Sequence, residues 1–218
     1  MKESEQEELF IKKGLKIIHN SQNHYLLMRL GGIYKGHPLI LRVIAGEIEN
    51  EPFNGNIEAY WNEISHKIEE VEKTMSEVEI DDTNIIGAND NWQIHKLTLK
   101  MQRIVIKQRF QVVFDRLKSQ VKDAYMMICA SSVYRIPVKE EGWLMQLESL
   151  IKHIEKVENS LDERLHQALD ELRNRFLIEE SFNHNNKRLV GMHNIIRSMA
   201  LEHHKKLIQQ LKKELENK

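Results

Sequence analysis

The sequence predicts a mostly α-helical protein made of long helical hairpins, which follow a small, turn-rich N-terminal subdomain. Two observations predict this fold class. Apolar residues recur every three or four positions over long stretches, as they do on one face of an α-helix. Five of the nine glycines lie between residues 14 and 46, which sets this part apart from the rest. We predict a small subdomain over residues 1–53, a hairpin over 54–137 and a second hairpin over 138–218.

The N-terminal subdomain begins with an amphipathic helix predicted over residues 4–19. Residues 24–49 hold two short apolar runs separated by glycines, and periodicity alone does not distinguish two helices from a β-hairpin there. Pro38 suits the first turn of a helix, and apolar residues from Leu41 to Ile48 recur at helical spacing. We favour helix for this segment and keep the β-hairpin as the alternative.

The first long hairpin starts after a loop at residues 51–55. A heptad-like seam then runs to residue 78 and is interrupted between Asp81 and Asn89. Its apolar positions are Ile57, Trp61, Ile64, Ile68, Val71, Met75 and Val78.

The stretch from Asn91 to Pro137 is predicted to form the central helix of the fold. It has no Gly or Pro before its end, and its apolar residues fall into two stripes. A helix that is apolar on more than one side must be covered on more than one side, which indicates a core helix. β-branched residues between Arg103 and Phe114 make a strand the competing prediction for that part.

The second long hairpin carries the clearest coiled-coil pattern of the chain. We predict one long helix after Pro137, a turn at Ser181–Asn186, and a last helix running from Leu189 to Leu215. Seams of this length often need helices of another copy or another protein. The predicted interface residues are Leu144, Leu147, Ile151, Ile154, Leu161, Leu165 and Leu172.

Composition excludes several classes of protein. With 41% hydrophobic and 30% charged residues, the 218-residue chain is predicted to be folded and soluble. No apolar run approaches the ~18 residues that cross a bilayer, so we expect a cytoplasmic protein without membrane contact. Cys129 is the only cysteine, which excludes an intramolecular disulfide, and its apolar neighbours predict a buried thiol.

Charge alternates along the chain. Residues 47–82 hold twelve acidic and two basic residues, and residues 96–122 hold one acidic and eight basic residues. An acidic stretch at 139–180 is likewise followed by a basic one at 183–213. Pairing within the fold would neutralise these charges, whereas binding to nucleic-acid phosphates is the alternative. The residues that would then contact nucleic acid are Lys96, Lys100, Arg103, Lys107, Lys187, Arg188, Arg197, Lys205 and Lys206.

Two segments pair an arginine with a histidine a few residues later: Arg188 with His193, and Arg197 with His203. This spacing resembles the Arg-x4-6-His motif of HEPN ribonucleases, all-helical proteins. The resemblance implies that a dimer brings two such pairs together. It departs from the family at Leu189, where HEPN proteins usually have a polar residue. In such a site His moves a proton and Arg stabilises phosphate charge. A solvated basic helix explains the same residues without catalysis.

Metal binding is not predicted. Glu63 with His66, and Glu163 with His166, have the spacing of bundle di-iron ligands, but the apolar seams point His66 and Glu163 largely outward. The remaining candidates are interpreted as exposed histidines, because no carboxylate-rich segment accompanies them. They are His184, His193, His203 and His204.

The function predicted from the sequence is that of a non-catalytic structural or adaptor subunit, which mediates protein–protein assembly in a larger bacterial or phage complex. Its partner would be a second copy or another helical protein, and nucleic acid is the alternative partner. No cofactor is predicted. A HEPN-like ribonuclease that uses Arg188 and His193 is the alternative function.

Overall fold

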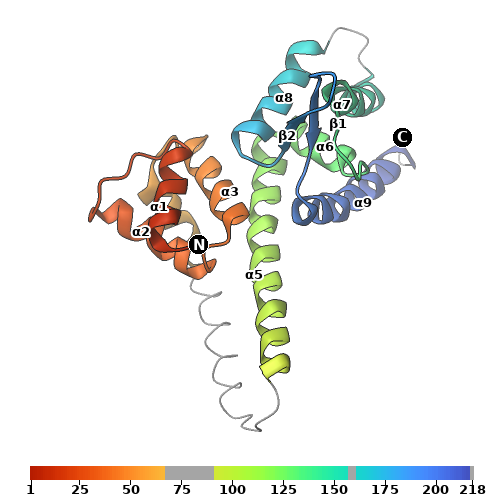
Figure 1. The fold of residues 1–218 in the computed structure, drawn as a ribbon. Coiled ribbons are helices and arrows are strands. Elements are labelled where there is room, and N and C mark those ends of the chain that lie inside the picture. Colours follow the sequence, from red (N-terminus) through yellow and green to blue (C-terminus); the bar gives the residue numbers. More distant parts are fainter. Residues whose placement is uncertain (67–90, 157–160, 217–218) are drawn as a thin grey trace. The chain divides into compact units, whose positions relative to one another are not determined.

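A computed structural model describes residues 1–66, 91–156 and 161–216, with the backbone alone described for 91–105 and 214–216. The chain is mostly helical and has one small antiparallel sheet (Figure 1). It divides into two compact units, Met1–Arg109 (unit 1) and Phe110–Lys218 (unit 2). The boundaries predicted from the sequence, at residues 53 and 137, lie elsewhere along the chain.

Unit 1 contains the helices α1 (Glu3–Lys12), α2 (Gln22–Ile33) and α3 (Pro38–Glu49), and residues 57–66 are also helical. The favoured helical prediction for residues 24–49 is confirmed, and the β-hairpin alternative is wrong. The first helix ends earlier than predicted, because Gly14 adopts a left-handed conformation with φ 102°.

The helix α3 forms the core of unit 1. Every residue from Leu39 to Ile48 is buried except the half-buried Arg42, and α1 packs against both α2 and α3. Pro38 occupies the first turn, where its missing N–H is not needed. Ile57 and Ile64 of the predicted seam are buried, whereas the part of the seam beyond residue 66 lies outside the described residues.

The predicted central helix is two helices, α5 (Asn91–Gln120) and α6 (Lys122–Ser131). The break occurs at Val121, whose φ of −134° and ψ of 64° are not helical. The competing strand between Arg103 and Phe114 is wrong, because α5 spans it. The apolar side chains from Phe110 onward belong to the core of unit 2, as predicted. These are Phe110, Val113, Phe114, Leu117, Tyr125 and Ile128.

The predicted long helix after Pro137 is also two helices, α7 (Glu140–Glu155) and α8 (Asp162–Asn174). Lys156 ends α7 in a left-handed conformation with φ 55° and ψ 36°. Because α7 and α8 pack against one another, the seam folds back on itself instead of extending as one coiled coil.

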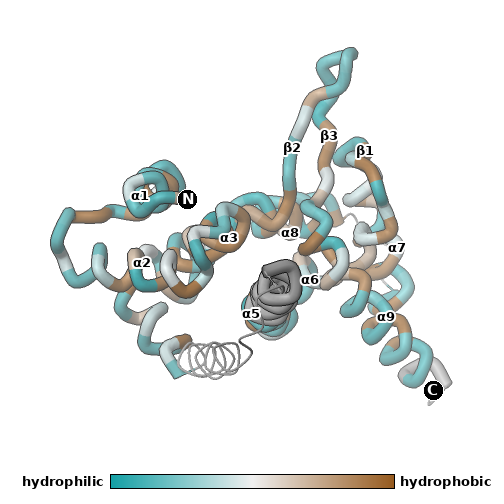
Figure 2. Tube along the Cα trace, turned by 60° about the horizontal axis from the view of Figure 1, so that its bottom comes forward, coloured by the Kyte–Doolittle hydropathy of each residue, from teal (hydrophilic) through white to brown (hydrophobic). Residues whose placement is uncertain are grey.

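The sheet of unit 2 has the strands β1 (Val138–Lys139), β2 (Glu179–Phe182) and β3 (Arg188–Gly191) in the order β1-β3-β2. Both pairings are antiparallel, with Val190 opposite Val138 on one side and Glu180 on the other. Figure 2 shows that the β2–β3 hairpin ends in a hydrophilic tip. The sequence did not predict a sheet in this region.

The last helix, α9 (Asn194–Glu216), begins later than predicted, because Leu189 lies in β3. The helices α7, α8 and α9 all pack against α6, with α8 and α9 on different sides of it (Figure 1). Every residue from Ala124 to Ser131 is accordingly buried. Within the described ranges, no helix combines the length and the hydropathy needed to cross a bilayer.

Candidate functional site

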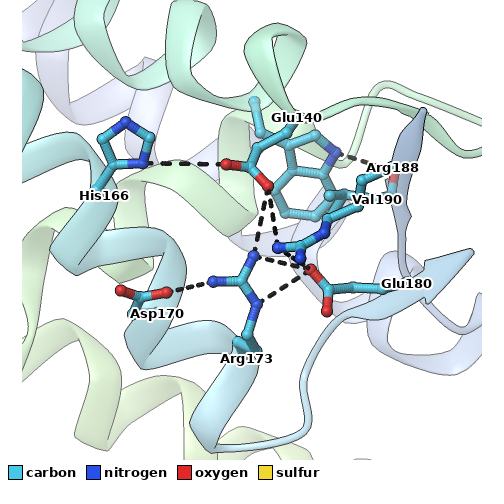
Figure 3. Close-up of polar contacts among 8 residues, drawn as sticks. Glu140, His166, Asp170, Arg173, Glu180, Arg188 and Val190 are labelled. Atoms are coloured by element: carbon cyan, nitrogen blue, oxygen red, sulfur yellow. Dashed lines mark hydrogen bonds and ion pairs between the residues drawn. The ribbon is translucent and has the colours of Figure 1, made fainter. Parts of the chain in front are cut away.

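The most strongly interconnected charged group of unit 2 lies where the β2–β3 hairpin meets α7 and α8 (Figure 3). We call it the Arg173 cluster. Its members are Glu140 at the start of α7, His166, Asp170 and Arg173 of α8, Glu180 of β2 and Arg188 of β3.

Arg173 is the centre of this cluster. Its Nη2 lies 2.7 Å from Glu180 Oε1 and 3.4 Å from Glu140 Oε2, and its Nη1 contacts Asp170. Hydrogen bonding to Glu180 raises the pKa of the Arg173 guanidinium. The guanidinium thus holds carboxylates of three different elements.

The hairpin brings the second arginine to the same carboxylates. Glu180 is opposite Val190, so Arg188, two residues before Val190, lies diagonally across on the same face of the sheet. Arg188 Nη1 lies 3.7 Å from both Glu180 Oε1 and Glu140 Oε2. The Nε1–H of the buried Trp143 donates to the carbonyl of Val190 over 3.2 Å, which fixes β3 on α7.

The arrangement suits electrostatic docking of the hairpin better than acid–base chemistry. Both arginines face carboxylates, and the pairs are only half-buried, with exposed fractions of 28% for Arg173 and 48% for Arg188. Ion pairs of this exposure contribute about 0–1 kcal/mol each. The cluster therefore orients the hairpin, and its arginines are engaged within unit 2.

A second arginine of α8, Arg164, is clamped in a similar way. Its Nε lies 2.5 Å from Asp123 Oδ2, and its Nη2 lies 2.7 Å from Glu155 Oε1. Both contacts are bidentate, which raises the pKa of Arg164 and lowers that of Glu155. Arg164 borders an open cleft of about 460 Å³ that also includes Lys122 and Glu171. The cleft lining thus contains one basic and one acidic residue, Lys122 and Glu171, beside Arg164, whose charge is already paired with Asp123 and Glu155.

The predicted catalytic residues do not share a helix. Arg188 lies in β3, and His193 lies in the segment between β3 and α9. The last helix was predicted to begin at Leu189 and so to contain His193, which is wrong because α9 begins at Asn194. Arg188 pairs with Glu140 and Glu180, and His193 Nδ1 accepts a hydrogen bond from the Ile195 N–H over 3.3 Å.

The second arginine–histidine pair lies on α9 but is engaged in the fold. Arg197 Nε donates to the Tyr134 carbonyl over 2.9 Å. His203 is buried and stacks on Phe114, with ring centroids 4.7 Å apart. Its Nδ1 atom is 3.2 Å from the hydroxyl oxygen of Tyr125. The interpretation of His203 as an exposed histidine was wrong. Burial, followed by the charge of Lys206, lowers its pKa.

Cys129 is buried, as predicted, and burial raises its pKa to about 12. A thiol with so high a pKa is protonated at neutral pH and is a poor nucleophile. His66 and Glu163 are exposed, as expected for side chains that point away from the apolar seams.

The residues proposed to bind nucleic acid are not brought together as one described surface. Lys187, Lys205 and Lys206 are exposed, on the hairpin turn and on α9. Lys107 is exposed on α5 and takes part in a polar or electrostatic interaction within the chain. The side chains of Lys96, Lys100 and Arg103 lie outside the described residues.

The predicted interface residues line the inside of unit 2. Leu147, Ile151, Leu165 and Leu172 are buried there, and Leu144, Ile154 and Leu161 are half-buried. Their apolar surface is used mainly between α6, α7 and α8. A partner would have to contact other parts of these helices.

Unit 1 contains a buried polar network that the sequence analysis missed. Arg109 forms an ion pair with Glu47 and a hydrogen bond to the Tyr60 hydroxyl, which lies 3.3 Å from Glu47 Oε2. The Arg109 guanidinium also lies 5.3 Å from the centre of the Tyr60 ring. Burial raises the pKa of the nearby Tyr34, an effect that Arg109 opposes. The only sequence signal was an acidic stretch followed by a basic one.

Unit 1 also brings together Glu7, His19 and His24, which the sequence analysis did not single out.

No protein-family model matches this chain, and no curated protein matches it in sequence.

Proposed function

We propose that this protein is a non-catalytic adaptor subunit that assembles through charged helix faces, with the acidic α8 of one copy facing the basic α9 of another. The observation that carries the proposal is the unequal use of charge in unit 2. Both arginines of α8 are held in ion pairs within the unit, whereas Lys205 and Lys206 of α9 are exposed.

The helix α8 has an excess of negative charge. It contains four acidic residues and two arginines. Arg164 is bound to Asp123 and Glu155, and Arg173 is bound to Asp170 and Glu180. These ion pairs do not include the exposed Glu163. An acidic helix attracts a basic partner and repels phosphate.

The order of elements in unit 2 supports a binding module. A helix, a short strand, two helices and a β-hairpin follow one another, which is the order of a winged helix-turn-helix. In helix-turn-helix domains the second helix of the motif enters the major groove of DNA. The corresponding helix here is α8, and its acidic residues would meet phosphates. This favours a protein partner over nucleic acid.

A second copy offers the complementary charge. From Asn194 to Lys213, α9 has five basic residues and one acidic residue. A contact of α8 with α9 that each pair of copies makes once is head-to-tail and yields a ring or an open chain, whereas one made twice about a two-fold axis yields a dimer.

Light scattering at low salt with charge-reversed variants tests the proposal. Glu163→Lys with Asp170→Lys on α8, or Lys205→Glu with Lys206→Glu on α9, should each weaken self-association of the full chain. Mixing the α8 variant with the α9 variant should restore association, because the unchanged basic α9 of the first meets the unchanged acidic α8 of the second. A chain carrying both changes should also associate again. A wild-type chain that stays monomeric at every concentration would contradict the proposal.

Fluorescence anisotropy with labelled duplex DNA and single-stranded RNA separates this function from nucleic-acid binding. We expect neither to bind at physiological salt. Salt-dependent binding that the α9 variant loses would instead assign the lysines to phosphate contacts. RNA cleavage that disappears in His193→Ala would favour the ribonuclease.

A further inference from the structure

Three potential metal ligands converge in unit 1. Glu7 lies on α1, His19 lies in the connection between α1 and α2, and His24 lies in the first turn of α2. His19 Nδ1 is 3.5 Å from Glu7 Oε1, and His24 Nε2 is 3.7 Å from Glu7 Oε2. One donor atom from each residue lies within 4.8 Å of the other two.

These distances suit a small tetrahedral cation. Zinc binds imidazole nitrogen and carboxylate oxygen at about 2.0–2.1 Å, so two ligand atoms of a tetrahedral site are roughly 3.4 Å apart. The two glutamate–histidine distances, one to each oxygen of the Glu7 carboxylate, are close to this value, and a rotation of the carboxylate would let one oxygen face both imidazoles. The two imidazole rings have centroids 4.7 Å apart and are tilted by 49°. A modest rotation of the exposed His19 side chain brings the third pair into range.

The fold holds two of the three ligands in place. The Ser21 hydroxyl accepts a hydrogen bond from the His24 backbone N–H over 3.2 Å and caps α2. The side chains of His24 and Glu7 have exposed fractions of only 16% and 24%. His19 is 68% exposed, and the buried Leu15 anchors the connection that carries it.

We propose that Glu7, His19 and His24 bind a divalent transition-metal cation of the Zn²⁺ class. Two imidazoles and one carboxylate favour Zn²⁺ over Mg²⁺ or Ca²⁺, which prefer sites made of oxygen ligands. Three protein ligands leave one tetrahedral position for water or an exchangeable group.

The bound cation would connect α1 to the start of α2 and restrain residues 13–21 between them. A ligand that binds only the folded chain stabilises it in proportion to the logarithm of its concentration over its Kd. The imidazoles must be unprotonated to bind the metal, so affinity falls on acidification. The site is independent of the α8–α9 contact, and either proposal can fail without the other.

Titration of the full, metal-stripped chain with ZnCl2, followed by calorimetry and by thermal unfolding, tests the site. We expect one equivalent to bind and to raise the Tm, whereas MgCl2 should do neither. Cobalt provides an independent spectroscopic measurement, because tetrahedral Co²⁺ absorbs in the visible range.

Matched variants assign the ligands. His19→Ala should reduce Zn²⁺ affinity by at least tenfold, and it should not unfold the protein, because its side chain is exposed. Glu7→Gln should have the same effect. His66→Ala removes an exposed histidine of the same unit outside the cluster and should bind like the wild type. Equal Zn²⁺ affinity in His19→Ala and the wild type, or loss of binding in His66→Ala, would overturn the assignment.

Discussion

Arg109 of α5 forms a buried ion pair with Glu47 of α3, and their side chains are 3% and 1% exposed. Both charges are shielded from bulk solvent, and the Tyr60 hydroxyl hydrogen-bonds to each of them. Arg109→Met should remove the ion-pair partner of a buried carboxylate and lower the free energy of unfolding by about 3–5 kcal/mol. Urea denaturation followed by circular dichroism measures this loss.

Two further variants make the Arg109 measurement specific. Lys107→Met removes an exposed positive charge two residues earlier on α5 and should change stability by less than about 1 kcal/mol. Glu47→Leu combined with Arg109→Met should recover part of the loss, because an apolar pair has no buried charge. An Arg109→Met protein as stable as the wild type would mean that Glu47 reaches water.

Leu117→Asp should prevent unit 2 from folding or severely destabilise it. Leu117 is 1% exposed, and an aspartate there would be an unpaired buried charge. Gln120→Asp, at the exposed end of α5, should cost less than about 1 kcal/mol. Thermal melts compare the two variants, and similar losses in both would remove this part of α5 from the core.

Acidification should destabilise unit 2 through His203. Its pKa in the folded state is lowered, so the unfolded chain takes up the proton first as the pH falls. Stability contributed by the neutral, buried imidazole is present at neutral pH and decreases as the pH falls below the ordinary histidine pKa of about 6.5. Urea unfolding at a series of pH values shows this dependence.

His203→Gln, which keeps a polar side chain beside Tyr125, should lose that part of the pH dependence. Comparing slopes between variant and wild type removes the contribution of carboxylates that both share. Equal slopes between neutral and mildly acidic pH would show that His203 titrates like an exposed histidine.

Arg173→Gln should loosen the hairpin more than Arg188→Gln does. Arg173 contacts carboxylates from α7, α8 and β2 and is less exposed than Arg188. We expect a loss of about 1 kcal/mol for Arg173→Gln at low salt and a smaller loss at high salt. Amide hydrogen exchange over residues 179–191 reports docking of the hairpin, and identical protection in both variants would contradict the difference.

Helix content was predictable from the sequence, but the ends of helices were not. The apolar pattern from Asn91 to Pro137 continues across Val121, and no Gly or Pro marks the non-helical backbone there. Lys156 adopts a left-handed conformation, which cannot be predicted from the residue type because lysine rarely adopts it. Apolar spacing reports which faces are buried, and both faces stay buried when a helix folds back on itself.

The sheet gave little sequence signal. All four residues of β2 are exposed, so this strand lacks alternating apolar and polar residues, and β1 has only two residues. The residues of β3, Arg188–Gly191, were largely included in the predicted last helix, because the apolar spacing of α9 extends back into them. Charge alternation was more informative, since Arg109 with Glu47 and Arg188 with Glu180 each join a basic stretch to an acidic one.

The metal-ligand candidates could not be found by spacing. Glu7, His19 and His24 are separated by intervals that match neither a helix nor a metal motif, and only the path of residues 13–21 brings them together. A glutamate and two histidines on either side of a short connection are common in sequences without a metal.

The burial of α6 has a consequence for how unit 2 is made on the ribosome. Apolar residues from Ala124 to Ile128 are among the first of this unit to be synthesised, yet α6 packs against α9, where Tyr125 contacts His203. The nascent chain therefore exposes this apolar surface until α9 has left the exit tunnel. Stop codons placed before residue 194 should therefore yield aggregating products rather than a smaller folded domain.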